Sequence, residues 1–132
     1  MAKKQKTVAK LKKELQLIFN AYIRKRDEDK PCISCGLHKE NKQAGHFFSV
    51  KGYDGLRFDP DNVHGECAGC NCFDESHLIY YNENLINRIG IEAYRNLKDK
   101  AYNYKKNGYK WSRSELIEMI EKYKQLLKDS KI

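Results

Sequence analysis

The chain has 132 residues, which is enough for one modest hydrophobic core and too short for two independent ones. Lys and Arg number 26 and Asp and Glu number 18, so the formal net charge is +8 and a polyanion is the expected partner. An aromatic content of 11% excludes a disordered basic tail. No apolar run is long enough to span a membrane, and the Lys-rich start has no signal-peptide core behind it. We therefore expect a folded, cytoplasmic protein without membrane contact.

The first element predicted is an amphipathic helix over residues 7–29. Its apolar side chains recur every three or four positions, at Val8, Leu11, Leu15, Ile18 and Tyr22. Residues 1–6 form a basic start that we expect to be frayed. Acidic residues and Pro31 end the helix just before the next motif.

Four of the five cysteines form two Cys-x-x-Cys pairs, Cys32 with Cys35 and Cys67 with Cys70. Each pair places two sulfur atoms at one tight turn, and two such pairs complete a tetrahedral zinc site. Because the protein fills all four positions, the zinc site predicted is structural rather than catalytic. Free thiols or redox pairs are the alternative, and Cys72 is the expected spare cysteine.

The segment between the two cysteine pairs predicts a β-hairpin. Its strands are two aromatic-rich runs, residues 44–50 and 56–59, joined by a Gly-rich turn. Residues 78–89 then carry apolar side chains at helical spacing, and Gly90 ends or kinks this helix. The fold expected for residues 32–89 is a zinc-bound core of two strands and a helix.

Two more helices are predicted over residues 91–130. Asn107-Gly108 separates them, and Ser112-Arg113-Ser114-Glu115 is a capping box for the second helix. Residues 1–132 are therefore expected to form a single α+β domain in which helices flank the zinc-bound core.

Several separated motifs, taken in order, resemble one known family. They are Asn20-Ala21-Tyr22-Ile23-Arg24, Pro31-Cys32-Ile33-Ser34-Cys35-Gly36, Ala44-Gly45-His46, Leu56-Arg57-Phe58, Asn62-Val63-His64, Cys67 to Asn71, and Leu85-Ile86-Asn87-Arg88-Ile89-Gly90. The order of cysteine pairs, His, Asn and helix is similar to that of the HNH nucleases, the ββα-metal group. From about residue 15 to residue 97, the motifs together resemble the phage NinG (Rap) family of recombination proteins.

This resemblance implies a metal-dependent endonuclease that cuts branched DNA, such as D-loops and Holliday junctions. His46 would be the general base, since a neutral imidazole can take a proton from water near neutral pH. Asn62 would hold the turn that carries His46. Asn71 would bind a catalytic Mg²⁺ or Mn²⁺ ion, which binds the scissile phosphate.

The sequence departs from the family pattern at two places. Many HNH nucleases have an Asp before the catalytic His, where this chain has Gly45, so the ion would have fewer protein ligands. After the second cysteine pair we expect a basic residue and then Gly-Asn, where this chain has Asp74-Glu75-Ser76-His77. His77 then becomes a candidate third member of the catalytic group. Asp74 or His64 could complete the metal shell.

Three basic residues, Lys51, Arg57 and Arg88, are candidates for contacts with DNA phosphates. The apolar stripes of the first and last helices each fit a coiled-coil seam. They either pack onto the zinc core of their own chain or join two copies of the chain. We expect a homodimer, because cutting both strands of a symmetric junction needs two active sites.

Simpler roles exist for the candidate site residues. His46 could be a satisfied polar residue of a hairpin, Asn62 a turn residue, Asn71 a helix N-cap, and His64 a residue that faces solvent or a phosphate. At the level of function, one alternative is a zinc-dependent DNA-binding module without catalysis. Another is an HNH nuclease that cuts plain duplex DNA.

Overall fold

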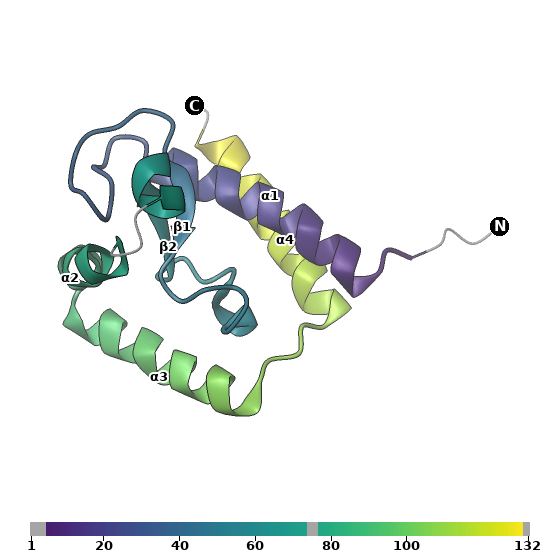
Figure 1. The fold of residues 1–132 in the computed structure, drawn as a ribbon. Coiled ribbons are helices and arrows are strands. Elements are labelled where there is room, and N and C mark those ends of the chain that lie inside the picture. Colours follow the sequence, from purple (N-terminus) through teal and green to yellow (C-terminus); the bar gives the residue numbers. More distant parts are fainter. Residues whose placement is uncertain (1–4, 74–76, 131–132) are drawn as a thin grey trace.

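The computed structural model describes residues 5–73 and 77–130, which are mostly helical with one small sheet (Figure 1). The elements follow in the order α1 (Val8–Arg26), β1 (Gln43–His46), a short 3₁₀ helix (Asp54–Leu56), β2 (Val63–Glu66), a π-helical turn (Gly69–Phe73), α2 (His77–Ile89), α3 (Ile91–Asn107) and α4 (Arg113–Asp129). The prediction of a mixed α+β fold is confirmed. Residues 1–4 of the predicted basic start lie outside the described residues.

Helix α1 begins after Thr7, whose side-chain oxygen accepts a hydrogen bond from the Lys10 N–H at 3.2 Å. Its buried side chains recur every four residues, at Leu11, Leu15, Phe19 and Ile23. The predicted stripe lies against the hydrophobic core that these side chains join, but it missed the fully buried Phe19 and Ile23. Ile18 and Tyr22 lie at the edge of the buried stripe and are only partly covered.

The prediction that this helix extends to residue 29 is wrong, because α1 ends at Arg26. Asp27 leaves the helical conformation, with φ −102° and ψ 10°. Its carboxylate accepts hydrogen bonds from the Arg26 guanidinium at 2.7 and 2.9 Å and from the Gly65 N–H at 2.8 Å. Arg26 also donates to the Val63 carbonyl at 2.8 Å. The end of α1 is thereby tied to β2.

Helices α1 and α4 lie side by side and enclose the first hydrophobic core (Figure 1). Phe19 packs edge-on against Tyr123 of α4, with ring centroids 5.0 Å apart, and against Phe58, at 5.9 Å. The predicted capping box of α4 is confirmed, since Ser112 and Glu115 each accept a hydrogen bond from the other's N–H. The apolar stripes of the first and last helices are buried against each other within one chain.

Strands β1 and β2 form an antiparallel pair in which Gln43 lies opposite Glu66, and His46 opposite Val63. Every residue of β2 is buried. Strand β2 therefore lies inside the protein and leads into the second cysteine pair, whereas β1 is only partly buried and leads from the first cysteine pair to His46.

The predicted hairpin of residues 44–50 and 56–59 is wrong in its second strand. In a strand, residues two positions apart face the same side. Leu56, however, packs into the second core and Phe58 into the first. The chain therefore turns here, through the short helix Asp54–Leu56, and the strand that pairs with β1 comes only afterwards.

Helices α2 and α3 enclose the second core, away from α1 and α4 (Figure 1). The buried residues of this core are Ile33, Leu56, Tyr81, Leu85, Tyr94, Leu97 and Ala101. The predicted break at Gly90 is confirmed, because its φ of +89° is a left-handed conformation that favours glycine. Within the described ranges, every helix is too short or too polar to cross a membrane.

Candidate metal centre and active site

The two cysteine pairs converge on one point. The sulfur atoms of Cys32, Cys35, Cys67 and Cys70 all lie within 4.8 Å of one another, and those of Cys35 and Cys67 are 3.9 Å apart. A tetrahedral zinc ion with Zn–S bonds of about 2.3 Å needs sulfur atoms about 3.8 Å apart. The four cysteines are therefore positioned to hold a metal ion, as predicted. Cys72 lies outside this group, as predicted for the spare cysteine.

Backbone N–H groups favour the thiolate form at this centre. The N–H groups of Cys35 and Cys67 point at the Cys32 sulfur, at 3.5 and 3.3 Å. Burial raises the pKa of the Cys32 thiol, but these donors outweigh burial and bring the pKa down to about 7. Burial and the neighbouring thiols raise the pKa of Cys70 instead. Four thiolates this close need a cation to offset their repulsion, and a zinc ion would supply that charge.

His46, the predicted general base, ends β1 and is half-buried. Its Nε2 lies 3.0 Å from the carbonyl oxygen of Arg57. A carbonyl oxygen only accepts, so Nε2 carries the proton and Nδ1 keeps a lone pair. Burial lowers the pKa of His46, and the positive charge of Arg57 lowers it further. The hydrogen bond to the Arg57 carbonyl raises the pKa but does not outweigh these two effects. The ring is therefore neutral at pH 7 and has a basic nitrogen.

Asn62 is buried, and its amide closes the loop between the strands. Its Oδ1 accepts from the Phe48 N–H at 2.8 Å, and its Nδ2 donates to the carbonyls of Phe48 and Leu56 at 3.0 and 3.1 Å. These bonds join the segment that follows His46 to the segment that precedes Arg57. Asn62 thus fixes the backbone on both sides of the contact that orients the imidazole.

His64 lies in the core, with 2% of its surface exposed. Its Nδ1 is 3.3 Å from the Tyr81 hydroxyl. Burial and the charge of Arg26 lower the pKa of His64 to about 3, so the ring is neutral. The alternative that His64 faces solvent is wrong, and its position favours packing over a contact with DNA.

Sequence reasoning missed Glu66, a fully buried carboxylate that joins several parts of the site. Its Oε2 accepts a hydrogen bond from the Ser34 hydroxyl and lies 2.6 Å from Nδ1 of His77. Ser34 belongs to the first cysteine turn and Glu66 precedes the second, so this carboxylate ties both turns to α2. The only signal in the sequence was an acidic residue directly before a metal-binding turn.

Asn71 lies inside the π-helical turn, so the alternative that it is the N-cap of α2 is wrong. Its Nδ2 donates to Oε1 of Gln43 at 2.7 Å, so the amide oxygen is the atom of this side chain that could bind a cation. Gln43 lies opposite Glu66 in the sheet, and Glu66 contacts His77. The structure therefore brings Asn71 and His77 to the same end of the sheet. Asp74 lies outside the described residues.

The three basic residues predicted to contact DNA differ in their surroundings. Arg57 donates to Gln16 of α1 at 2.9 Å and is mostly buried. Arg88 donates to the Pro31 carbonyl at 3.2 Å and anchors α2 beside the first cysteine pair. Lys51 is exposed in the loop after β1. Of these three residues, Lys51 is therefore the best placed to contact a phosphate.

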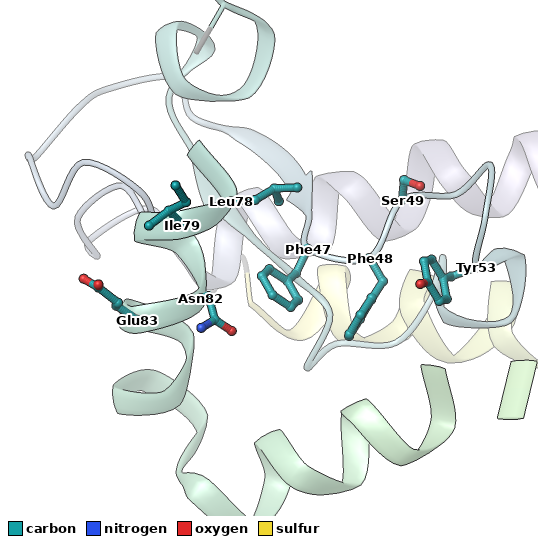
Figure 2. Close-up of a pocket in the computed structure, with 8 residues that line it drawn as sticks. All are labelled: Phe47, Phe48, Ser49, Tyr53, Leu78, Ile79, Asn82 and Glu83. Carbon is teal, nitrogen blue, oxygen red and sulfur yellow. The ribbon is translucent and has the colours of Figure 1, made fainter. Parts of the chain in front are cut away.

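The two residues that follow His46 line an apolar pocket of about 600 Å³ (Figure 2). The loop contributes Phe47 and Phe48, and the first turn of α2 contributes Leu78 and Ile79. These two α2 side chains are 42% and 62% exposed. Aromatic faces accessible beside a polar rim are able to stack against a flat ring such as a nucleobase.

Known proteins are similar to this chain over nearly its whole length. The family model described as Bacteriophage Lambda NinG protein matches residues 1–132. The chain belongs to the NinG family. It is 40% identical to Protein ninG of Escherichia phage 933W over 118 residues, which are 89% of this chain and 56% of that protein. Over the same length it is 38% identical to Protein ninG of Salmonella phage P22 and 37% identical to that of Escherichia phage lambda.

This NinG-family chain spans about half the length of the curated relatives it matches. No solved structure matches it significantly. The resemblance inferred from the motifs is thus confirmed at the level of the family. The names of the relatives state no activity, so a proposal about activity rests on the site.

Proposed function

We propose that this NinG-family protein is a metal-dependent DNA endonuclease of phage recombination, which cuts branched DNA in the cytoplasm of the host cell. One observation carries the proposal. The His46 ring is neutral, its Nε2–H is fixed on the Arg57 carbonyl, and its Nδ1 keeps a lone pair. A ring held in one tautomer is suited to general-base catalysis, which a module that only binds DNA does not need.

In the proposed reaction, Nδ1 of His46 takes a proton from a water molecule. The water oxygen forms a bond to phosphorus, and the bond between phosphorus and the 3′ oxygen breaks. The departing oxygen takes a proton from solvent, so the products carry 5′-phosphate and 3′-hydroxyl ends. Asn62 positions the imidazole, because it holds the backbone after His46 and the backbone before Arg57, whose carbonyl accepts the imidazole hydrogen bond.

The two metals proposed have different tasks. Zinc on the four cysteines is structural, since a complete sulfur shell leaves no position for water or substrate. A Mg²⁺ or Mn²⁺ ion would supply positive charge to the scissile phosphate and to the leaving oxygen. The oxygen donor that fits this ion is the Asn71 amide, whose nitrogen is already bonded to Gln43.

Charge and shape support branched DNA as the substrate. The net charge of +8 and the exposed Lys51 favour a phosphate backbone. The pocket of Phe47 and Phe48 would stack an unpaired base, which a branch point offers and an intact duplex does not. A second copy of the chain would cut the second strand of a symmetric junction, which is the reason to propose a homodimer.

The test is a cleavage assay with the zinc-loaded chain, a labelled four-way junction and a linear duplex of the same sequence. With Mg²⁺ or Mn²⁺ we expect cuts in the junction, at least about 10-fold faster than in the duplex, and none in EDTA. Equal rates on both substrates would support a plain-duplex nuclease instead. Tight, salt-sensitive binding without any cutting would support a binding module and overturn the proposal.

A further inference from the structure

The carboxylate of Glu66 is only half satisfied. Its side chain has no exposed surface, and its Oε2 accepts from Ser34 and contacts His77. Among the described residues, Oε1 is buried without any hydrogen-bond partner. An unpaired buried carboxylate oxygen is unfavourable, because it has lost its hydrogen bonds to water and has no hydrogen bond in the protein to replace them. A proton on Oε1 would not remove the problem, since the resulting hydroxyl would itself need an acceptor.

The position of Oε1 depends on Gly45. A Cβ atom at Gly45 would lie 2.3 Å from Oε1 and 2.9 Å from the Glu66 Cβ, closer than atoms can approach. The backbone N–H and carbonyl groups here serve the strand pair, and the Gly45 carbonyl also accepts from the Tyr81 hydroxyl at 2.6 Å. The missing side chain therefore makes room for the carboxylate one residue before His46.

The donors around Glu66 are those that a hard divalent cation prefers. Gln43 lies opposite Glu66 and holds the nitrogen of the Asn71 amide, so the Asn71 oxygen lies at the same end of the sheet. His77 brings an imidazole from the start of α2. Carboxylate and amide oxygens are ligands of Mg²⁺ and Mn²⁺, and imidazole is a further ligand of Mn²⁺.

A purely structural role accounts for only part of this arrangement. The Ser34 and His77 contacts explain why a carboxylate links the cysteine turns to α2, but both use Oε2. These two contacts do not explain why the other carboxylate oxygen, Oε1, is buried next to Gly45. Gly45 makes room for Oε1, and a cation next to Oε1 would explain why the charge is buried there.

We infer that Glu66 supplies a carboxylate oxygen to a divalent cation that it shares with Asn71, and that His77 positions this carboxylate. The inference rests on the proposed function, because it names a carboxylate ligand for the ion of the endonuclease. In this arrangement the ion lies beside the residue that precedes the general base.

The test measures Mn²⁺ binding to the zinc-loaded full chain by electron paramagnetic resonance, in which free Mn²⁺ gives the signal. The Glu66→Gln variant keeps an oxygen for Ser34 and loses the charge, so we expect Mn²⁺ affinity to fall at least about 10-fold. Asn71→Ala should weaken binding in the same direction. Glu118→Gln, which changes an exposed carboxylate of α4, should bind Mn²⁺ as the wild type does.

Zinc content and thermal unfolding of each variant show whether the cysteine centre survives. Should Glu66→Gln lose its zinc, Asn71→Ala and His77→Ala become the deciding variants. Mn²⁺ binding that is equal in the wild type and in Glu66→Gln or Asn71→Ala would overturn the inference, even if the wild type cuts junctions. Binding that depends on Glu66 in a protein that cuts no DNA would uphold the ion site and overturn the proposed function alone.

Discussion

The orientation of the His46 ring depends on the side-chain amide of Asn62. This amide makes three hydrogen bonds to backbone groups of Phe48 and Leu56, and none of its surface is exposed. Its removal would leave those groups unpaired inside the protein. Asn62 is therefore expected to affect both stability and the orientation of His46 through the same contacts.

We expect Asn62→Ala to lower the free energy of unfolding by about 2–4 kcal/mol, because buried polar groups lose their partners. Urea unfolding of the zinc-loaded chain measures this loss. The matched control is Asn96→Ala, an exposed asparagine of α3, which should change stability by less than about 0.5 kcal/mol. Equal effects of the two substitutions would contradict the assigned role of Asn62.

His64 makes stability depend on pH in a definite direction. Its folded-state pKa of about 3 lies below the unfolded value of about 6.5, so the unfolded chain binds more protons between these values. The stability that the neutral His64 ring contributes is fully present above about pH 6.5 and is lost as the pH falls below that value. We expect His64 to account for roughly 3 kcal/mol of loss between about pH 7 and about pH 4.

The measurement compares urea unfolding of His64→Gln with that of the wild type over this range. Acid also protonates the zinc-binding thiolates in both proteins, so the informative quantity is the difference between them. That difference should change steadily as the pH falls, whereas His38→Gln, an exposed histidine, should follow the wild type. A constant difference between His64→Gln and the wild type would rule out the buried neutral ring.

At the scale of the elements, the metal-binding role of the two cysteine turns can be tested by comparing Cys70 with the nearby Cys72. Cys70 belongs to the cluster of four sulfur atoms, and Cys72 does not. Purified wild type and Cys72→Ser should each contain about one zinc ion per chain, and Cys70→Ser much less, with a lower melting temperature. Atomic absorption measures the zinc content. An equal zinc content in both variants would refute the four-cysteine site.

The pairing of α1 with α4 predicts a second result at this scale. Phe19 contacts Phe58 and Tyr123, so Phe19→Ala should cost about 3–5 kcal/mol in urea unfolding. The neighbouring Leu17 is 75% exposed, and Leu17→Ala should cost less than about 0.5 kcal/mol. A Phe19→Ala variant of wild-type stability that only dissociates a dimer would show that the stripe joins two chains instead.

The helices could be predicted from the sequence because their signals are local. The capping box at Ser112 and the break at Gly90 each depend on residues within a few positions. The second strand had no such signal. Its His64 and Glu66 are polar residues buried by distant partners, Tyr81 for one and Ser34 for the other. Strand burial that depends on tertiary contacts is invisible to a periodicity argument.

The candidate site divides in the same way. The cysteine cluster could be predicted because metal binding needs those side chains at that spacing. The role of His46 stays a prediction, made because proton transfer near neutral pH needs an imidazole. The anchor of His46 could not be predicted, because it is the backbone carbonyl of Arg57, which any residue at that position would offer. The side chain of Arg57, which is predicted to contact a DNA phosphate, donates a hydrogen bond to Gln16 in the structure.

At the scale of the whole molecule, two small cores lie around the two-stranded sheet, and the cysteine centre ties the loop before β1 to the turn after β2. A chain of 132 residues has little apolar surface to hold long loops, so a bound metal would contribute stability that neither core supplies. His46 at the end of β1 and the loop that follows it are thereby held between the two cores, with the pocket of Phe47 and Phe48 beside them. The basic charge of the chain would bring DNA to this loop.

The central claim is that this molecule cuts DNA with His46 as the base. Its most direct test compares wild type, His46→Ala and His38→Ala, each loaded with zinc, for the single-turnover cleavage of a four-way junction in Mg²⁺. We expect His46→Ala to cut at least about 100-fold more slowly while it keeps its zinc and its affinity for the junction, and His38→Ala to match the wild type. Cleavage by His46→Ala at the wild-type rate would contradict the account.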